Sequence, residues 1–397
     1  MTVRQKFWPA RRRILIDPRL RINRPPGARR WLGAATMMVC LLSPAVVGQE
    51  KDDAAAPDRP ASAASQNSAA LIRQAYKLSE KAATVEELTK VIDQCRRGLE
   101  DTQLSQAMQD YAGKLLAWTY DKRGLALDED DHLEEAMADF EEAIRFNPSR
   151  WQAVHNRGVS YARLGKYDEA IADFDRTIEL NPNYANAYFN RGELYYELGK
   201  FRRAVADYNQ CLRRQPRDTA AYNSRGHAYY RMANYRSAIS DYNQAIRLDP
   251  NNAAAYTNRG DAYADLGQYR QAAKDYRAAI RVDPKLGRAY QSAAWLMATC
   301  PDERYRETQK AVSAARRAVE LDGESYRYLD TLAAAYANAG NFEKARAVQA
   351  RVVKTAPQEL TARYENRLRL YEHDRPYRDQ LPSRTQSVRS RGGRRPS

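Results

Sequence analysis

Cysteine and histidine are scarce in this chain, whose 397 residues contain four of each. Cys40 falls in an N-terminal leader, Cys211 takes a small-residue helix position, and Cys95 and Cys300 lie far apart. We therefore expect no disulfide framework, and thiols that act as small apolar groups. The histidines show no metal-ligand spacing with one another or with cysteine, so the sequence predicts no metal site and no cofactor.

The chain also lacks a glycine-rich phosphate-binding loop, because each glycine of its central region falls at a helix-packing or turn position. Asp and Glu are abundant, but they lie on amphipathic helical patterns, where carboxylates mostly form solvated faces. Neither pattern supports catalysis. We therefore expect a protein that is not an enzyme and has no small-molecule substrate.

The central region has no net charge, although the whole chain carries +15. Residues 1–48 contain ten Lys or Arg and one acid, and residues 375–397 contain seven Arg and one Asp. The segment between them is therefore formally neutral. By bulk charge it is no surface for polyanions, so nucleic acid is not favoured as its partner.

An Arg-rich stretch and an apolar run from Trp31 to Gly48 begin the chain. This order is typical of a secretory signal peptide, with cleavage expected after Gly48. The basic stretch is longer than usual, so retention as an N-terminal anchor stays open, and any membrane contact would be through this segment. We expect export in a bacterium, to the periplasm, the cell envelope or the medium.

One 34-residue sequence repeat occurs four times between Trp151 and Leu286. Gly is at position eight, Tyr at eleven, Ala at twenty, Phe or Tyr at twenty-four, and Pro at thirty-two. In order of position, these residues are Gly158, Gly192, Gly226 and Gly260; Tyr161, Tyr195, Tyr229 and Tyr263; Ala170, Ala204, Ala238 and Ala272; Phe174, Tyr208, Tyr242 and Tyr276; Pro182, Pro216, Pro250 and Pro284. Small residues allow two antiparallel helices to approach, aromatic rings fill the space beside them, and Pro ends the second helix.

These spacings resemble the tetratricopeptide repeat family, whose unit is a helix–turn–helix. The resemblance implies an all-α fold, an α-solenoid of stacked antiparallel helix pairs in a right-handed superhelix. We expect about seven to eight helical hairpins.

Composition and repeat register divide the chain into seven expected segments. They are residues 1–48, the signal peptide or anchor; 49–67, a flexible linker; 68–116, a divergent helical hairpin region; 117–286, five repeats; 287–325, an irregular repeat with an insertion; 326–375, the last repeat and a capping helix; and 376–397, a disordered Arg-rich tail.

Arg replaces the expected Leu at position seven of five repeats, and Asp follows sixteen residues later each time. These positions lie roughly level in an antiparallel hairpin. We therefore predict a series of structural ion pairs, each worth about 0–1 kcal/mol if exposed. The predicted pairs are Arg123 with Asp139, Arg157 with Asp173, Arg191 with Asp207, Arg225 with Asp241, and Arg259 with Asp275.

Asn recurs at position six, as Asn156, Asn190 and Asn258, with Ser224 interrupting the row. The resemblance implies that this helix face lines the concave surface and that the Asn row grips an extended peptide. An amide offers both a donor and an acceptor to any peptide unit. Alternatively, these side chains solvate the face or bond neighbouring helices. The side chains expected to set specificity in this groove are His155, Phe189, Glu193, Asn223, His227, Asp261 and Asp265.

The sequence thus predicts a non-enzymatic interaction scaffold that binds an extended peptide or partner protein in its groove. The alternative is an envelope-associated structural or assembly protein whose basic C-terminal tail contacts an anionic surface or nucleic acid.

Overall fold

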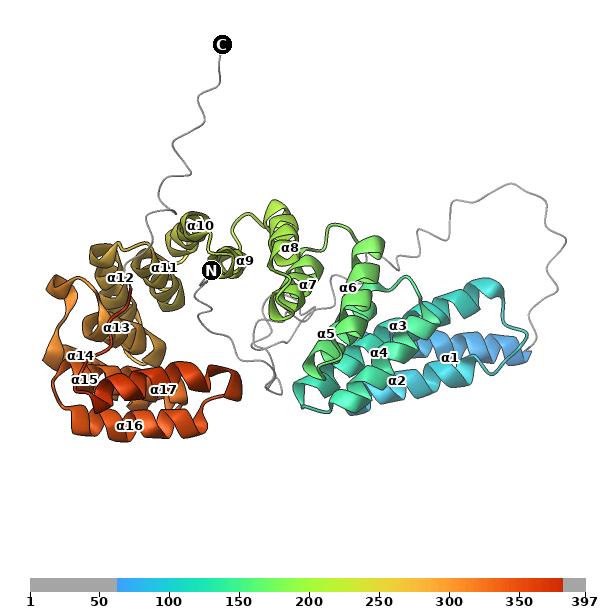
Figure 1. Cartoon of the computed structure of the whole chain (residues 1–397). Coiled ribbons are helices and arrows are strands. Elements are labelled where there is room, and N and C mark those ends of the chain that lie inside the picture. Colours follow the sequence, from blue (N-terminus) through green and yellow to red (C-terminus); the bar gives the residue numbers. More distant parts are fainter. Residues whose placement is uncertain (1–62, 381–397) are drawn as a thin grey trace, which may run out of the picture. The chain divides into compact units, whose positions relative to one another are not determined.

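The computed structural model describes residues 63–380, which form seventeen α-helices, one 3₁₀ turn and no strand (Figure 1). The all-α class expected from the repeats is confirmed. The leader and residues 381–397 lie outside the described range. The helices are α1 (Ala63–Ser79), α2 (Val85–Gly98), α3 (Gln106–Glu129), α4 (Leu133–Phe146), α5 (Trp151–Arg163), α6 (Tyr167–Leu180), α7 (Ala185–Glu197), α8 (Phe201–Arg214), α9 (Thr219–Arg231), α10 (Tyr235–Leu248), α11 (Ala253–Asp265), α12 (Tyr269–Val282), α13 (Gly287–Thr299), α14 (Thr308–Asp322), α15 (Tyr326–Asn338), α16 (Phe342–Thr355) and α17 (Gln358–Glu372).

The described chain divides into two compact units, residues 63–194 and 195–380, with the division inside α7. We call them the N-terminal and C-terminal units. Within the N-terminal unit, α1–α2, α3–α4 and α5–α6 pack as hairpins. Within the C-terminal unit, α9–α10, α11–α12, α13–α14 and α15–α16 do so, and α17 packs on α16. The seventeen helices are slightly more than seven to eight hairpins contain, so the count is roughly consistent with the expectation.

The hairpins α3–α4, α5–α6, α9–α10 and α11–α12 each close over the position-eight glycine of the first helix. A Cβ added at Gly226 would lie 2.8 Å from Cε1 of Tyr242, and one at Gly158 would lie 3.0 Å from Cε1 of Phe174. Both rings are fully buried. Position eight is therefore small because the aromatic side chain at position twenty-four packs directly against the backbone there.

The prolines end the second helices as expected. Helices α6, α8, α10 and α12 each stop two residues before the Pro at position thirty-two. The residue before a proline is disfavoured in helical geometry, so the chain turns there into the next unit.

The turn between the two helices of a repeat needs a left-handed residue. Gly165, Gly199 and Gly267 have φ between 71° and 75° at this position. In the remaining clean repeat Ala233 takes φ 57°. An alanine held in this region is strained, because its Cβ approaches the following carbonyl oxygen.

One expected segment boundary differs from the helices observed. Helix α1 begins at Ala63, inside the segment expected as linker. Residues 61–67 are rich in Ala and polar residues and contain no Pro. No residue in this stretch stops a helix, so α1 extends into it.

The insertion of the irregular repeat forms a short turn. Between α13 and α14 lies the 3₁₀ helix η2 (Glu303–Tyr305), capped by the Asp302 carboxylate, which accepts from the backbone N–H of Arg304. Arg306 donates to the carbonyl oxygen of Cys300 at 2.9 Å. The added residues therefore leave α13 and α14 packed as a hairpin.

The beginning of the C-terminal tail is ordered, in contrast to the expectation of a disordered segment from residue 376. Residues 376–380 follow α17 and contact α13 and α15. Polar composition favoured disorder, but Tyr377 and Asp379 find specific partners that composition does not reveal. None of the helices in residues 63–380 combines the length and apolar character that a bilayer crossing requires.

Candidate interaction face

The Asn row of the N-terminal unit lies between repeats, where it is buried. Asn156 donates from Nδ2 to Oδ1 of Asp121 at 2.9 Å, and Asn190 donates from Nδ2 to Nε2 of His155 at 3.1 Å. Each bond links a position-six amide to position five of the preceding repeat, thirty-five residues earlier. These amides therefore tie adjacent repeats together.

His155 stands at the centre of this buried network. Its Nε2 accepts from Asn190, so the ring proton is placed on Nδ1, which faces Oδ1 of Asn156 at 3.3 Å. Asp121, which Asn156 contacts, also accepts from Arg150 at 2.6 Å. Burial lowers the pKa of His155 to about 4, and the hydrogen bond to Asn156 opposes this shift. The imidazole is therefore neutral at physiological pH.

The same arrangement recurs in the C-terminal unit. Asn258 donates from Nδ2 to Oδ1 of Asn223 at 3.0 Å, again across thirty-five residues. Where position five is Phe189, which offers no acceptor, position six of the next repeat is Ser224. This pairing of residue types was a signal in the sequence for inter-repeat bonds.

The position-six side chains Asn156, Asn190 and Asn258 are all buried. They bond neighbouring helices, as the alternative interpretation of the sequence predicts. His155 and Glu193, expected to set specificity, are buried as well. Ser224, His227 and Asp261 are only partly buried. The structure thus separates the predicted groove residues into a buried set, mostly in the N-terminal unit, and a more accessible set in the C-terminal unit.

Four of the five predicted Arg–Asp pairs are present, each with two hydrogen bonds. Their Nη2–Oδ1 distances are 2.7 Å for Arg123–Asp139, 2.8 Å for Arg157–Asp173, 2.6 Å for Arg225–Asp241 and 2.7 Å for Arg259–Asp275. The Asp carboxylates are buried, so these pairs are not the exposed ones assumed from the sequence. The pair Arg191–Asp207 falls across the two units and stays a prediction.

The position-seven Arg also reaches back to the preceding repeat. Arg225 donates from Nη1 to Asn209 at 2.6 Å, and Arg259 donates from Nη1 to Asn243 at 2.7 Å, in each case sixteen residues earlier. Each of these guanidinium groups therefore bonds residues sixteen positions ahead and sixteen behind. Their fork geometry suits this double contact, which a lysine could not make.

We call the surface formed by Tyr230 on α9, by Asn258, Asp261 and Asp265 on α11, and by Arg288 on α13 the α9–α13 face. Of the partly buried predicted residues it contains Asp261, whereas Asn258 and Asp265 are its buried members. Neighbouring first helices contact each other here, α9 with α11 and α11 with α13. Position-two and position-nine side chains of adjacent repeats meet along this face. It lies entirely within the C-terminal unit.

Arg288 is the cation of this face. Its Nη2 donates to Oδ2 of Asp261 at 2.8 Å and its Nη1 to Oδ1 of Asn258 at 2.6 Å. The Asp261 carboxylate also accepts from the hydroxyl of Tyr276 at 2.9 Å. Although it is held by two partners, the Arg288 side chain is 42% exposed. The Arg288 side chain is therefore fixed in place while part of its surface stays in contact with solvent.

Tyr230 and Asp265 extend the face. The Tyr230 hydroxyl donates to Oδ2 of Asp265 at 2.6 Å. Burial, together with the neighbouring Asp265 and Asp261 carboxylates, raises the pKa of Tyr230. The phenol therefore remains protonated and acts as a donor. Sequence reasoning missed Tyr230, Tyr276 and Arg288 because their partners come from other helices.

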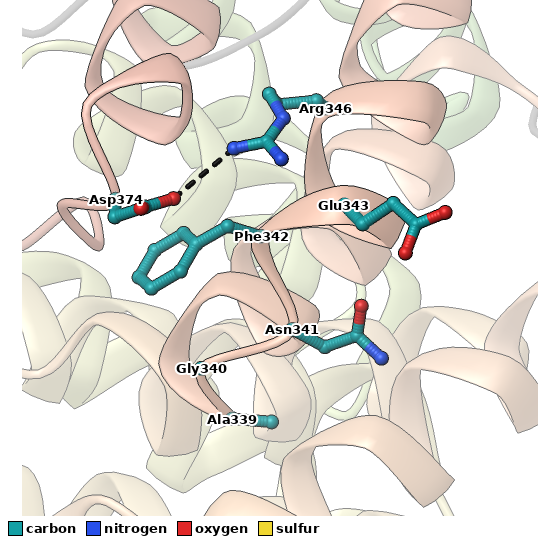
Figure 2. A pocket seen from close by; sticks show the side chains of 7 residues that line it. All are labelled: Ala339, Gly340, Asn341, Phe342, Glu343, Arg346 and Asp374. Atoms are coloured by element: carbon teal, nitrogen blue, oxygen red, sulfur yellow. Dashed lines mark hydrogen bonds and ion pairs between the residues drawn. The ribbon is translucent and has the colours of Figure 1, made fainter.

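A shallow hollow lies between the α15–α16 turn and Asp374, two residues after the end of α17 (Figure 2). It is lined by Ala339, Gly340, Asn341, Phe342, Glu343, Arg346 and Asp374. Arg346 and Asp374 form an exposed ion pair across it at 3.1 Å. Within residues 63–380, no group of three or more His, Cys, Asp or Glu could hold a metal ion.

Family comparisons agree with the repeat register. Tetratricopeptide-repeat patterns match residues 119–150, 185–218 and 253–286, and further repeat patterns match 158–199 and 234–267. No curated protein matches the chain.

Several solved structures are similar to parts of the chain at low identity. PilF of Pseudomonas aeruginosa is 16% identical with a TM-score of 0.48, over 54% of this chain and 96% of that one. YrrB, described as a repeat protein with an unusual peptide-binding site, is 22% identical with a TM-score of 0.40, over 44% and 89%. MamA of Desulfovibrio magneticus RS-1 is 21% identical with a TM-score of 0.41, over 42% and 95%. The five-residue register, the hairpins closed over position-eight glycines and the matched repeat patterns together show that the chain contains tetratricopeptide repeats within residues 119–286.

Proposed function

We propose that this protein is a non-enzymatic interaction scaffold whose α9–α13 face binds an extended segment of a partner protein. Tetratricopeptide repeats support the general role, since each repeat exposes the face of its first helix and stacking continues that face from repeat to repeat. The partner is a protein or peptide. Its identity is a matter for experiment.

The observation that carries the proposal is the state of Arg288. Asp261 and Asn258 hold its guanidinium at 2.8 and 2.6 Å, yet 42% of the side chain stays exposed. A guanidinium has five N–H donors, so groups remain for a peptide carbonyl or carboxylate. Because its orientation is already set, binding loses little side-chain entropy there.

The grip on a peptide differs from the one expected from the sequence. Asn156, Asn190 and Asn258 already bond neighbouring repeats, so a peptide would have to displace buried hydrogen bonds to reach them. We place the contacts with the peptide instead on the exposed edge of the α9–α13 face. Arg288 would bind the peptide, and Asp261 would orient the Arg288 guanidinium.

A photo-crosslinking amino acid at Ala254 tests this proposal in the full chain. Ala254 is exposed and holds position two of α11, the position that Arg288 holds in α13. We expect crosslinking in the native host to give defined partner proteins, identifiable by mass spectrometry. Adding Arg288→Ala should reduce the crosslinked yield about tenfold or more, as loss of a central charged anchor does.

Two controls make the test specific. The same crosslinker at Gln271, exposed on the second helix α12, should not give these partners. Arg277→Ala, which removes an exposed charge from α12, should leave the Ala254 yield unchanged. Equal products from Ala254 and Gln271, or insensitivity to Arg288→Ala, would contradict the proposal.

Export remains part of the proposal. The leader of residues 1–48 supports secretion to the periplasm, envelope or medium, and N-terminal sequencing of the mature protein would test cleavage after Gly48. The alternative, in which the Arg-rich tail contacts an anionic surface, rests on residues 381–397 outside the described range. Deleting them while keeping residues up to 380 would show whether partner crosslinking depends on the tail.

A further inference from the structure

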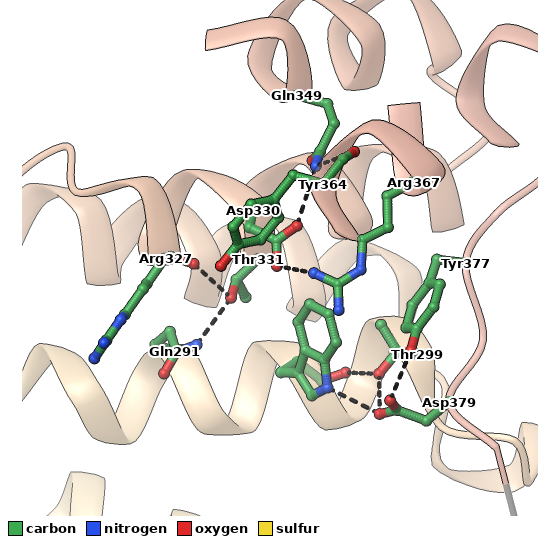
Figure 3. Close-up of polar contacts among 11 residues, drawn as sticks. Gln291, Thr299, Arg327, Asp330, Thr331, Gln349, Tyr364, Arg367, Tyr377 and Asp379 are labelled. Carbon is green, nitrogen blue, oxygen red and sulfur yellow. Dashed lines mark hydrogen bonds and ion pairs between the residues drawn. The ribbon is translucent and has the colours of Figure 1, made fainter. Parts of the chain in front are cut away.

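The segment after α17 lies against α13 as a bound peptide would. The backbone N–H of Asp379 donates to the carbonyl oxygen of Thr299 at 2.8 Å. Its carboxylate Oδ2 accepts from Nε1 of Trp295 at 2.8 Å and lies 2.9 Å from the Thr299 hydroxyl (Figure 3). One acidic residue is thus recognised through both its backbone and its side chain.

The residue before it bridges two helices. Arg378 donates from Nη1 to the carbonyl oxygen of Ala298 on α13 and from Nη2 to Oδ1 of Asn338 on α15, both at 2.9 Å. The contacts of residues 378 and 379 therefore use main-chain and side-chain groups of two successive first helices. Such contacts are typical of extended-peptide recognition.

An aromatic residue completes the contact. The ring of Tyr377 lies 5.9 Å from that of Trp295, centre to centre. The guanidinium of Arg367 on α17 lies 4.5 Å from the Tyr377 ring and 4.6 Å from the Trp295 ring. Tyr377 thus covers a cation–aromatic cluster that the fold has already assembled (Figure 3).

Arg367 is the most informative residue of this cluster. It is 2% exposed and pairs with Asp330, whereas its Nε and Nη2 are buried with no hydrogen-bond partner in the described part of the chain. A buried donor left unpaired is unfavourable. Residues 376–380 therefore pack against Arg367 without providing hydrogen-bond acceptors for its Nε and Nη2.

The residues that the segment contacts hold repeat positions that continue the α9–α13 face. Trp295, Ala298 and Thr299 hold positions nine, twelve and thirteen of the repeat that begins at Gly287. Asp261 holds position nine one repeat earlier, on the α9–α13 face. The segment 376–380 thus occupies the next stretch of the same face, within the same unit.

We propose that the surface around Trp295, Thr299, Asn338 and Arg367 is a peptide-binding site, which we call the Trp295 site. Its ligand is an extended segment with an aromatic residue two positions before an acidic one. Residues 376–380 of the same chain fill it in cis, and a partner of this chemistry competes with them. This inference rests on the proposed function, because it places a second subsite on the peptide-binding face.

Tethering makes the cis occupant strong but replaceable. Tyr377 follows the end of α17 by only five residues, so its effective concentration at the site is on the order of millimolar. A free peptide of equal affinity at micromolar concentration would therefore rarely displace it. A partner can displace residues 376–380 if it binds more tightly than they do. Pairing with the unsatisfied N–H groups of Arg367, or a second contact with Arg288, would supply that additional affinity.

Fluorescence anisotropy with the full chain tests the site. The probe is a labelled synthetic peptide of residues 374–382, DRPYRDQLP. The double variant Tyr377→Ala, Asp379→Ala should bind it about tenfold or more tightly than the wild type, because the tethered competitor is weakened. The matched control Arg375→Ala changes an exposed neighbour and should bind as weakly as the wild type.

Two further changes establish recognition. A probe in which Asp379 is replaced by Ala should lose most of its affinity for the double variant. Adding Trp295→Phe, which keeps an aromatic ring and removes the Nε1 donor, should weaken the unaltered probe as well. Circular dichroism during heating shows whether each variant is folded.

A folded double variant that fails to bind the probe would overturn the inference and assign residues 376–380 a structural role only. Equal binding by wild type and double variant would also overturn it, and so would binding that appears only in a dimer on light scattering. Crosslinking at Ala254 does not use the Trp295 site. The proposed function can therefore survive a negative result here, and the two failures are distinguishable.

Discussion

Asn190 donates its amide hydrogen to Nε2 of His155 at 3.1 Å, one repeat earlier in the chain. The bond requires a neutral imidazole. A protonated Nε2 carries a hydrogen of its own and cannot accept one from the Asn190 amide. A bond between two repeats thus depends on the protonation state of one buried histidine.

This arrangement makes the N-terminal unit sensitive to acid. Burial lowers the pKa of His155 to about 4, whereas the unfolded chain takes up a proton in the ordinary histidine range. The contribution of neutral His155 to stability is therefore complete above the ordinary histidine pKa, and it is lost as pH falls toward about 4. The loss amounts to about 3 kcal/mol, measurable by urea unfolding between pH 7 and pH 4.

A comparison of variants isolates this effect from the titration of carboxylates. His155→Gln cannot be protonated, so its free energy of unfolding should fall less over the same range. His373→Gln, at an exposed position, should follow the wild type. Parallel curves for His155→Gln and wild type would contradict the assignment.

Ala233→Gly should stabilise the protein by about 0.5–1 kcal/mol. Ala233 has φ 57° at a turn position where the other clean repeats have Gly. Glycine relieves the steric strain of the left-handed conformation, and its larger unfolded-state entropy offsets part of the gain. Urea unfolding measures the change. The reciprocal variant Gly267→Ala should destabilise by about 1 kcal/mol, and a change of the same sign in both variants would refute the argument.

Arg225→Ala should destabilise the C-terminal unit by about 3 kcal/mol, because it leaves the buried Asp241 carboxylate without its bidentate partner. It also breaks the bond to Asn209 in the preceding repeat. Arg304→Ala is the control, since loss of the solvent-screened Arg304–Asp302 pair should change stability little. Similar losses in both variants would show that burial is not the deciding factor.

The buried thiols should be unreactive in the native protein. Burial raises the pKa of Cys95 to about 12 and that of Cys300 to about 11, so almost no thiolate is present at pH 8. Iodoacetamide labelling, read residue by residue by mass spectrometry, should leave both unmodified until guanidinium chloride unfolds the chain. Rapid native labelling of Cys95 would contradict its burial.

The repeat residues predicted most of the fold correctly, because their roles are local. Gly226 and Tyr242 meet within one hairpin, and Arg225 and Asp241 pair across the same two helices. A register of positions is sufficient to place such partners opposite each other. The start of α1 was less predictable, because no Pro or Gly marks a limit there.

The accessible face was harder to predict, because its partners come from different repeats or from the chain end. The Asn row was identified correctly as a pattern, but its hydrogen bonds depend on what position five of the preceding repeat offers. Composition indicated disorder from residue 376, whereas Asp379 is bound by Trp295, eighty-four residues away. No periodicity in the sequence connects these two residues.

The amino-acid sequence by itself determined the hairpin, its repeat and the ion pair inside it, since each depends on contacts within about one 34-residue unit. Only the tertiary structure decided which polar side chains are used up between repeats, which remain accessible as Arg288 does, and where the chain end lies. The physical reason is that stacking, rather than local register, sets burial, and burial determines whether a polar group bonds its own chain or remains open to a partner.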